Sequence, residues 1–390
     1  MKPNLKVWVN ISSKDASHNY KTVRSLLAPK TKLWAVVKSN AYGHGLLAFS
    51  KIANDLGVDG FCVDSVVEGT KLRQNGIKKP ILVLGPTLPG LLVDAAKNKI
   101  AVTISAPEQL TAYLKSKFKP EFHLKIDTGM HRQGFYPNDL KKIIRQIKNF
   151  PPQILKTAHR RRDPVSGGTR LKIQDSLTGV YTHFASAKDI NYPTFTDLQF
   201  EEFQKAVRIL EKSGFKNLIK HCAASGGALI NKKYHLDAAR IGIALYGLWP
   251  SRELEVQLGN KIKLKPVLSW HSIISETKSL KKGDYVGYDL TEKILKPTKI
   301  AVIPIGYWHG FDRKLSSVGE VLIKNKRARV LGRVSMDLIV VDVGNIQCRA
   351  GDRATLIGGE ITASELAQKT ATTHYEIITR INPLTERIVI

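Results

Sequence analysis

A single lysine, Lys38, closes an apolar run of the sequence and precedes a turn of small and polar residues. The run Trp34–Val37 has the character of a buried strand, and Tyr42 follows within the turn. An isolated lysine in such a place would most often be a solvated strand end. A lysine that is buried instead has a lowered pKa, and its amine is then free to attack an aldehyde as a nucleophile.

Further reactive side chains stand at or just after the ends of later strand-like runs. They are Asp127 with Arg132, His183, Ser225, and Arg240 followed by Gly242 and Ile243. Hydroxyl groups and accessible backbone N–H groups suit a phosphate dianion. A buried lysine beside a phosphate site therefore indicates a Schiff base with a phosphorylated aldehyde.

Eight strand-like runs that alternate with helical patterns would position these side chains. The runs are nearly continuous in apolar residues, as strands covered on both faces tend to be. They cover residues 33–39, 60–65, 80–86, 100–105, 122–129, 179–185, 218–225 and 238–247. Eight strand–helix units in about 250 residues predict a (β/α)8 TIM barrel, in which catalytic groups come from the C-terminal strand ends. A doubly wound sheet is the alternative, but no G-x-G-x-x-G follows the first strand and no Walker A sequence occurs.

The clearest helical pattern is TDLQFEEFQKAVRILEKSG, which begins at Thr196 and ends at Gly214. Thr196 or Asp197 is expected to cap its start, and Gly214 is expected to end it. The residues expected near one face are Leu198, Phe203, Val207 and Leu210.

Beyond residue 250 the pattern changes to short strand-like runs, with one helical pattern at 362–370. The predicted fold class is therefore α/β, with an N-terminal (β/α)8 barrel and a C-terminal mostly-β domain. The expected domains are an N-terminal strand at 1–12 that joins the β domain, the barrel at 13–250 and the β domain at 251–390. The polar, basic segment 157–176 is expected to be a mobile surface loop.

Composition limits the classes of partner. The formal net charge is +28, but the basic residues are spread along the chain without a nucleic-acid-binding motif, so we expect a solvated surface and no nucleic-acid partner. No apolar run is long enough to span a bilayer, and the N-terminus lacks the apolar core of a signal peptide. The three cysteines are widely separated, so we expect buried thiols, no metal site and a cytoplasmic location.

The stretch AVVKSNAYGHG resembles the cofactor-attachment motif of the alanine racemases, pyridoxal 5′-phosphate (PLP) enzymes with an N-terminal barrel and a C-terminal β domain. Other blocks match that family in the same order: KIDTGMHRQGF, GVYTHFASAKDIN, ARIGIALYGLWPS, VGYDLTEK, IPIGYWHG, LGRVSMDLIVVDV and HYEIITRI. The resemblance covers nearly the whole chain, except segment 157–176 and the C-terminal tail. It implies PLP as cofactor, alanine as substrate and D-alanine for peptidoglycan as product.

The resemblance implies two bases, one on each face of the substrate Cα. Lys38 matches the lysine that holds PLP and serves as one base, and Tyr288 matches the other base. In the family this tyrosine comes from the second subunit of a homodimer with shared active sites. A phenol with a pKa of about 10 is a weak base at neutral pH. The resemblance supplies assistance through a chain from Arg240 to His183 to Tyr288.

Arg240 matches the arginine that the family places against the pyridine nitrogen of PLP. A guanidinium cannot accept a hydrogen bond and keeps its proton, so the ring nitrogen should stay unprotonated. Negative charge that develops at Cα is then less delocalised, which should favour return of a proton to Cα over transamination.

The remaining matches concern the phosphate and the substrate. The phosphate set is Tyr42, Ser225, the backbone of Gly242 and Ile243, and Tyr375. Arg132 matches an arginine that contacts the cofactor's phenolic oxygen and the substrate carboxylate, and Lys125 matches a position that is a carbamylated lysine in some relatives. Met336 and Asp337 match a substrate-facing pair donated across the dimer, and Tyr307 matches a tyrosine at the mouth of the substrate channel.

Departures from the family pattern and rival functions complete the prediction. Ala224 replaces the usual asparagine before the phosphate serine, and Trp308 and His309 replace the usual Ala-Asp of a YADG sequence. A broad-specificity amino-acid racemase of the same family is the alternative function. A related decarboxylase would need a catalytic cysteine in the β domain, but Cys348 lies outside the matched blocks. A PLP carrier or a basic nucleic-acid binder would not need the β domain.

Overall fold

The computed structural model describes residues 5–151 and 173–390. Its contacts divide the chain into two compact units. Ser17–Lys38 and Ser50–Lys265 form one, which we call the barrel unit, and Met1–Ala16, Ser39–Phe49 and Pro266–Ile390 form the other, the β unit. The part of segment 157–176 up to residue 172 lies outside the described residues, and Ile173–Ser176 forms a short 3₁₀ turn, η3.

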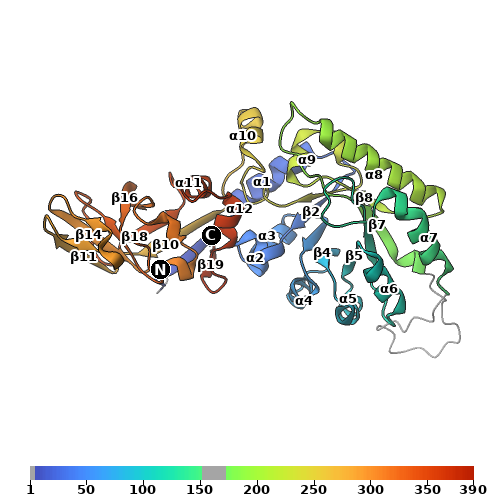
Figure 1. The fold of residues 1–390 in the computed structure, drawn as a ribbon, viewed down its shortest axis with the longest axis horizontal. Coiled ribbons are helices and arrows are strands. Elements are labelled where there is room, and N and C mark those ends of the chain that lie inside the picture. Colours follow the sequence, from blue (N-terminus) through green and yellow to red (C-terminus); the bar gives the residue numbers. More distant parts are fainter. Residues whose placement is uncertain (1–4, 152–172) are drawn as a thin grey trace. The chain divides into compact units, whose positions relative to one another are not determined.

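An eight-stranded parallel sheet forms a nearly closed barrel, which confirms the predicted architecture (Figure 1). Its order is β8-β7-β6-β5-β4-β3-β2-β9. The strands are β2 (Lys32–Val36), β3 (Gly60–Val63), β4 (Ile81–Pro86), β5 (Ala101–Ile104), β6 (Phe122–Lys125), β7 (Leu177–Tyr181), β8 (Ile219–His221) and β9 (Ala238–Ile241). The last strand pairs in parallel with the first, and a bridge between Ala224 and Arg240 draws the chain after β8 towards β9.

Helices lie between the barrel strands, as parallel connections require (Figure 1). They are α3 (Leu46–Asp55), α4 (Val66–Gln74), α5 (Leu92–Lys97), α6 (Pro107–Lys115), α7 (Leu140–Asn149), α8 (Thr194–Lys212) and α9 (Ser225–Ile230), while α1 (Ser13–Leu26) precedes the first barrel strand and α10 (Arg252–Leu258) follows the last. Helix α10 begins at the cap Ser251, whose hydroxyl accepts the N–H of Leu254.

Helix α8 exists as predicted, but its buried face differs from the prediction. Leu198 is 54% exposed, whereas the polar residues Thr196 and Gln199 are buried. Gln199 accepts the N–H of Ala185, and Thr196 donates to the carbonyl of Ser186, so both are satisfied by the loop after β7. Neither predicted cap forms, because the helix already begins at Thr194. The spacing of hydrophobic residues could not predict that polar side chains of this helix would be buried through hydrogen bonds to a loop.

The β unit is built on a nine-stranded sheet with the order β11-β14-β17-β16-β15-β18-β10-β1-β19. Its strands are β1 (Val7–Ile11), β10 (Leu268–Ile273), β11 (Glu276–Leu280), β14 (Thr298–Ile303), β15 (Glu320–Ile323), β16 (Lys326–Leu331), β17 (Ile339–Asp342), β18 (Arg353–Ile357) and β19 (Glu386–Val389). A separate ribbon consists of β12 (Tyr285–Val286) and β13 (Glu292–Lys293). Strand β1 pairs with β10 in antiparallel and with β19 in parallel register.

Two helices follow the strands of the β unit, α11 (Ala363–Lys369) and α12 (His374–Thr379). The sequence predicted only one helix beyond residue 250, so α10 and α12 correct that expectation. The letters of α12, HYEIIT, are rich in β-branched and aromatic residues, which favour strands. Tertiary packing of Ile377 and Ile378, both buried, overrides that preference.

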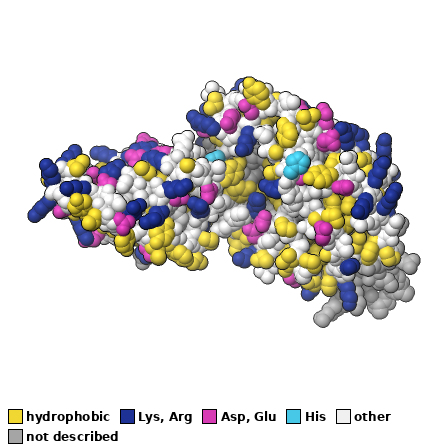
Figure 2. Space-filling view, in the orientation of Figure 1, with side chains coloured by type: hydrophobic (Ala, Val, Ile, Leu, Met, Phe, Trp, Pro, Cys, Tyr) yellow, Lys and Arg dark blue, Asp and Glu magenta, His cyan; other side chains and the backbone are white. Residues whose placement is uncertain are grey.

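The surface is basic over the visible face of both units (Figure 2). Lys and Arg side chains are spread across it rather than gathered in one stripe. The three cysteines, Cys62, Cys222 and Cys348, are buried free thiols, as predicted. Within 5–151 and 173–390, no helix combines the length and the apolar character that a bilayer crossing needs.

Candidate active site

Lys38 is half-buried where the chain leaves β2. The residues that follow it, Ser39 to Tyr42, form the element α2 (Lys38–Tyr42), which is a left-handed turn rather than an α-helix. Their φ angles lie between 51° and 55°, in a region that L-residues rarely occupy. Consecutive strained residues of this kind cluster at functional sites, and they persist only where the surrounding contacts hold them.

Arg240 on β9 makes hydrogen bonds to several groups at one end of the barrel. Its Nη1 donates to Nδ1 of His221 at 2.5 Å, and its Nη2 donates to Nδ1 of His183 at 3.3 Å. The terminal nitrogens also donate to the backbone carbonyls of Thr182, His221 and Cys222. Its guanidinium carbon lies 4.9 Å from the centre of the Tyr181 ring. All these bonds use the terminal nitrogens, so among the described residues the Nε–H is left for a ligand.

Two histidines that the sequence analysis did not single out support Arg240 from within the barrel. Nε2 of His221 lies 2.8 Å from Nδ1 of His123, and the ring of His221 stacks on Tyr181 with 4.7 Å between centroids. Burial, followed by the charge of Arg240, lowers the pKa of His123 to about 3 and that of His221 well below its usual value. Both rings are therefore neutral. Because Nδ1 of His221 accepts from Arg240, its Nε2 carries the proton that His123 accepts.

His183 is held neutral by the same forces. Burial and then the charges of Arg240, Lys125, Arg132 and Lys38 lower its pKa well below 6.5. Its Nδ1 accepts from Arg240, so the proton of the neutral ring lies on Nε2. This side chain therefore presents a hydrogen-bond donor, fixed in one tautomer, to whatever occupies the space beyond it.

Lys125 and Arg132 add positive charge to the same end of the barrel. Burial, then Arg132 and Arg240, lower the pKa of Lys125 to about 8. The Nζ of Lys125 donates to Oε1 of Gln133 at 2.9 Å, a partner that the sequence analysis missed. Arg132 is exposed.

Asp127, named above for its place at a strand end, has a structural role in this loop. Partial burial opposes the change, but backbone N–H groups of residues 129–132 bond to its carboxylate and lower its pKa. The carboxylate thus shapes the loop that carries Arg132, and its charge also acts on Lys125.

Ser225 and Gly242 lie next to one another in the barrel unit. The Oγ of Ser225 accepts the N–H of Gly242 at 3.0 Å and that of Ala244 at 3.4 Å. A hydroxyl oxygen that accepts these bonds still has its own proton to donate. Ala224, where the family usually has asparagine, stands at the N-cap of α9 without a side-chain bond.

Tyr42 and Tyr375 lie together in the β unit. Their ring centroids are 6.1 Å apart, and the ring of Tyr375 stacks on His374 at 4.8 Å. Burial and the neighbouring Tyr42 raise the pKa of Tyr375 above its usual value, so its hydroxyl keeps its proton at every pH of interest. Each of the two side chains carries a hydroxyl, a group that can donate one hydrogen bond.

The residues expected to act across a dimer lie on the surface of the β unit. Tyr288, in the short turn η5 (Tyr288–Leu290), is 69% exposed, Met336 is 54% exposed and Tyr307 is 45% exposed. Asp337 has its carboxylate 3.9 Å from Nδ1 of His309. Arg333 bonds to Asp289 at 3.0 Å and so joins the loop of Tyr288 to the strand end that leads to Met336. Other large apolar side chains on this surface are also exposed, among them Leu290, Trp308 and Leu338.

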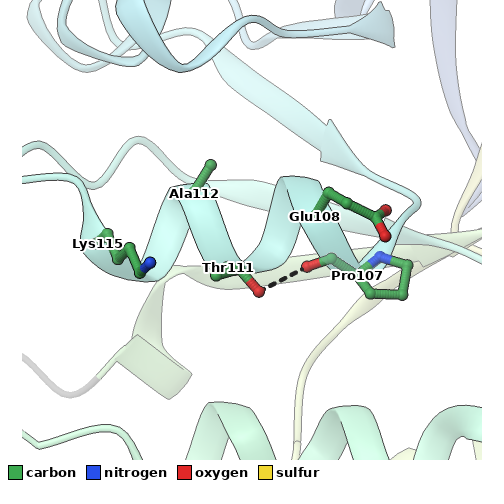
Figure 3. Close-up of a pocket in the computed structure, with 5 residues that line it drawn as sticks. All are labelled: Pro107, Glu108, Thr111, Ala112 and Lys115. Carbon is green, nitrogen blue, oxygen red and sulfur yellow. Dashed lines mark hydrogen bonds between the residues drawn. The ribbon is translucent and has the colours of Figure 1, made fainter.

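A surface pocket of about 380 Å³ lies along α6 and is unrelated to these residues (Figure 3). It is lined by Pro107, Glu108, Thr111, Ala112 and Lys115. Its one internal bond joins the Thr111 hydroxyl to the carbonyl of Pro107 within the helix (Figure 3). It has no convergent set of polar groups, so the strand ends of the barrel remain the candidate site.

Comparisons with known proteins agree in both units. The family model described as "Alanine racemase, N-terminal domain" matches residues 11–158 and 169–250, and "Alanine racemase, C-terminal domain" matches residues 267–389. The chain is 36% identical over 406 residues to an alanine racemase of Leptospira interrogans, covering 100% of this chain and 97% of that protein. It is 33% identical over 395 residues to an alanine racemase of Methanococcus maripaludis, covering 98% of each.

Solved structures give the same result. The alanine racemase from the D-cycloserine producer Streptomyces lavendulae superposes with a TM-score of 0.86 at 30% identity and covers 100% of this chain and 98% of that one. The alanine racemase from Bacillus anthracis, solved with bound L-Ala-P, has a TM-score of 0.86 at 32% identity and covers 99% of this chain and 95% of that one.

Proposed function

The chain belongs to the alanine racemase family, and from that membership we propose that it is a PLP-dependent enzyme that interconverts L-alanine and D-alanine. The observation that carries the proposal is the buried Arg240, which faces the barrel end with neutral histidines and carbonyls as its partners. The broad-specificity alternative is not favoured, because the relatives and the solved neighbours named above are alanine racemases.

The residues present fit PLP. The Nε–H of Arg240 suits an unprotonated pyridine nitrogen, the hydroxyls of Tyr42 and Tyr375 suit a phosphate, and the amine of Lys38 suits an aldehyde. When bound, the cofactor supplies an electron sink for the charge that develops at the substrate Cα. In the barrel unit, Ser225 with the backbone of Gly242 and Ile243 is proposed to complete the phosphate contacts.

Two bases on opposite faces of Cα would then exchange its proton. We assign Lys38 to one face and Tyr288 of a second subunit to the other. The exposed phenol of Tyr288 supports this assignment, because nothing within its own unit covers most of it. The Nε2–H of His183 is a suitable donor to the phenolic oxygen, and Arg240 fixes the tautomer that makes it one.

Substrate recognition is proposed for the groups around these bases. Arg132 would bind the alanine carboxylate, while Met336, Asp337 and Tyr307 would line the approach from the partner subunit. Carbamylation of Lys125 is a further part of the proposal, since burial lowers its pKa to about 8 and a lysine of that pKa presents a fraction of free amine to carbon dioxide. The intact mass of native protein, measured with and without bicarbonate, would reveal that adduct.

We further propose a homodimer with shared active sites, located in the cytoplasm, whose D-alanine serves peptidoglycan. The exposed surface of the β unit that contains Tyr288, Leu290, Trp308, Met336 and Leu338 supports the dimer, since such apolar surfaces mark interaction sites. The family membership of both halves of the chain supports the remainder.

The test is a racemisation assay on L-alanine with added PLP, coupled to a visible absorbance spectrum of the purified protein. We expect an absorbance band from the bound cofactor and D-alanine formation, both abolished by Lys38→Ala. Serine, lysine and arginine in parallel assays measure specificity. A protein that takes up no PLP and forms no D-amino acid from any of the four would refute the proposal.

A further inference from the structure

Arg387, on the last strand β19, joins the two segments that carry Tyr42 and Tyr375. Its Nε and Nη2 both donate to the carbonyl of Gly43, each at 3.1 Å. The same guanidinium donates to the carbonyl of Ile381 at 3.1 Å and to that of Asn382 at 2.7 Å. Bonds to the carbonyls of Pro383 and Thr385 complete the set. All these acceptors lie either directly after Tyr42 or in the segment that follows α12.

The turn needs an external support at this point. Residues 39–42 are left-handed, and each such L-residue costs about 1–2 kcal/mol. A Cβ added at Gly43 would lie 1.9 Å from the carbonyl oxygen of Ile378, so the turn and α12 are in direct backbone contact. Charge-assisted bonds from a rigid guanidinium fork are suited to hold such a contact, because the donors are planar and their spacing is fixed.

The hydrogen bonds of Arg387 affect the relative position of one pair of side chains, Tyr42 and Tyr375. Tyr42 directly precedes Gly43. Tyr375 lies on α12, and the segment that follows this helix supplies the other carbonyls that Arg387 binds. A change in the separation of Gly43 and Ile381 would therefore change the 6.1 Å separation of the two phenol rings.

We propose that Arg387 is a positioning residue for the phosphate of the cofactor: it fixes the spacing of the Tyr42 and Tyr375 hydroxyls by tying the left-handed turn to the end of α12. This inference rests on the proposed function, because it takes these tyrosines to be phosphate ligands. A purely structural role would be to anchor the C-terminus, and the two roles predict different results with a ligand that lacks the phosphate.

The test compares the dissociation constants of PLP and of pyridoxal, measured by absorbance on the full-length apoprotein. Pyridoxal has the same aldehyde but no phosphate, so it reports on the Lys38 region alone. For Arg387→Met we expect PLP affinity to fall about tenfold, the size of one lost charge-assisted bond, with pyridoxal affinity nearly unchanged. Arg387→Lys keeps the charge without the fork and should recover only part of the loss.

Arg380→Met is the matched control. Arg380 lies in the same segment and has the same chemistry, but it is paired at the surface with Asp312 and Glu376. It should leave both affinities unchanged. Tyr42→Phe combined with Arg387→Met should lose less than the sum of the two single losses, because both act on one contact.

The outcomes separate the two proposals. Wild-type protein with equal affinity for PLP and pyridoxal would refute the proposed phosphate site and this inference with it. A wild-type preference for PLP that persists undiminished in Arg387→Met, or equal losses of both affinities, would overturn the role of Arg387 alone. Should Arg387→Met fail to fold, the same ratio measured on Arg387→Lys decides the question.

Discussion

At the scale of single residues, positive charge predominates at the barrel end, although the carboxylate of Asp127 acts on Lys125. Arg240 is buried, yet its five hydrogen bonds go to two neutral imidazoles and three carbonyls. Lys38, Lys125 and Arg132 add further positive charge, and each contributes to the lowered pKa of His183. A site of this kind is stabilised by an anionic ligand, which is what a phosphate and a carboxylate would provide.

The neutral histidines make stability depend on pH. Burial and the charge of Arg240 lower the pKa of His123 to about 3, whereas an unfolded histidine titrates near 6.5. The unfolded chain therefore binds a proton first, and the stability contribution is full above the unfolded pKa and is lost as the pH falls. The loss is at most about 1.4 kcal/mol per pH unit for one such histidine.

We expect His123→Gln to reduce the slope of the unfolding free energy against pH between about pH 7 and about pH 5. The reduction should correspond to at most one proton taken up on unfolding, whatever the effect of the substitution on absolute stability. Urea unfolding followed by circular dichroism at several pH values measures this slope. Thr103→Val is the control, because it breaks the neighbouring bond to the Tyr181 hydroxyl without removing a titratable group. An unchanged slope in His123→Gln would show that its ring titrates equally in both states.

At the scale of elements, the barrel was readable from the sequence and the turn after Lys38 was not. Buried parallel strands are continuous apolar runs, so all eight appear as such in the sequence. The left-handed turn is formed by Ser39, Asn40, Ala41 and Tyr42, none of which is glycine, and local preference argues against it. Its conformation depends on Arg387 and α12, which lie more than three hundred residues away in the chain.

Site residues could be predicted from the sequence where they stand at or near the end of an apolar, strand-like run. Lys38 follows β2, His183 follows β7 and Arg240 lies within β9, and the structure gathers them with Lys125 at one barrel end. His123 was missed because it lies within β6, whereas His221 is the last residue of β8 and was missed although it stands at a strand end. One signal was available: His123 stands two residues before Lys125, so both project from the same side of β6. Gln133 carried no comparable signal.

Helix α11 ends in a motif that favours glycine but contains alanine. Ala371 is exposed with φ of 54°, and Thr372 donates to the carbonyl of Ala367 at 2.9 Å, as in a Schellman ending. We expect Ala371→Gly to stabilise the β unit by about 0.5–1 kcal/mol, since relief of left-handed strain exceeds the added freedom of the unfolded chain. The midpoint of urea unfolding measures the gain. Ala371→Val should shift the same midpoint down, and a gain in both variants would contradict the strain argument.

At the scale of the whole molecule, the β unit of the single chain leaves several large apolar side chains exposed. Tyr288, Leu290, Trp308, Met336 and Leu338 are each at least 46% exposed. The residues proposed to reach a second active site belong to this same surface. Catalysis and association are therefore coupled in the proposal, because a separated chain would lack one of its two bases.

A mixture of two inactive proteins tests this coupling. Lys38→Ala and Tyr288→Phe each lack one base, but a mixed dimer has one site with both. With random exchange of subunits, about a quarter of wild-type activity should return. Differently tagged chains and native mass spectrometry establish that exchange has taken place. If exchange is complete and activity stays absent, the two bases do not come from different chains.

The high positive charge has a consequence for association. Every copy carries a formal charge of +28, and on the face drawn in Figure 2 Lys and Arg are spread widely, with Asp and Glu scattered among them. Two copies that approach one another repel, and only the apolar contact opposes this. Dissolved salt shortens the range of the repulsion to about 10 Å at 0.1 M. The pair should accordingly tighten as ionic strength rises, the reverse of an assembly held together by opposite charges.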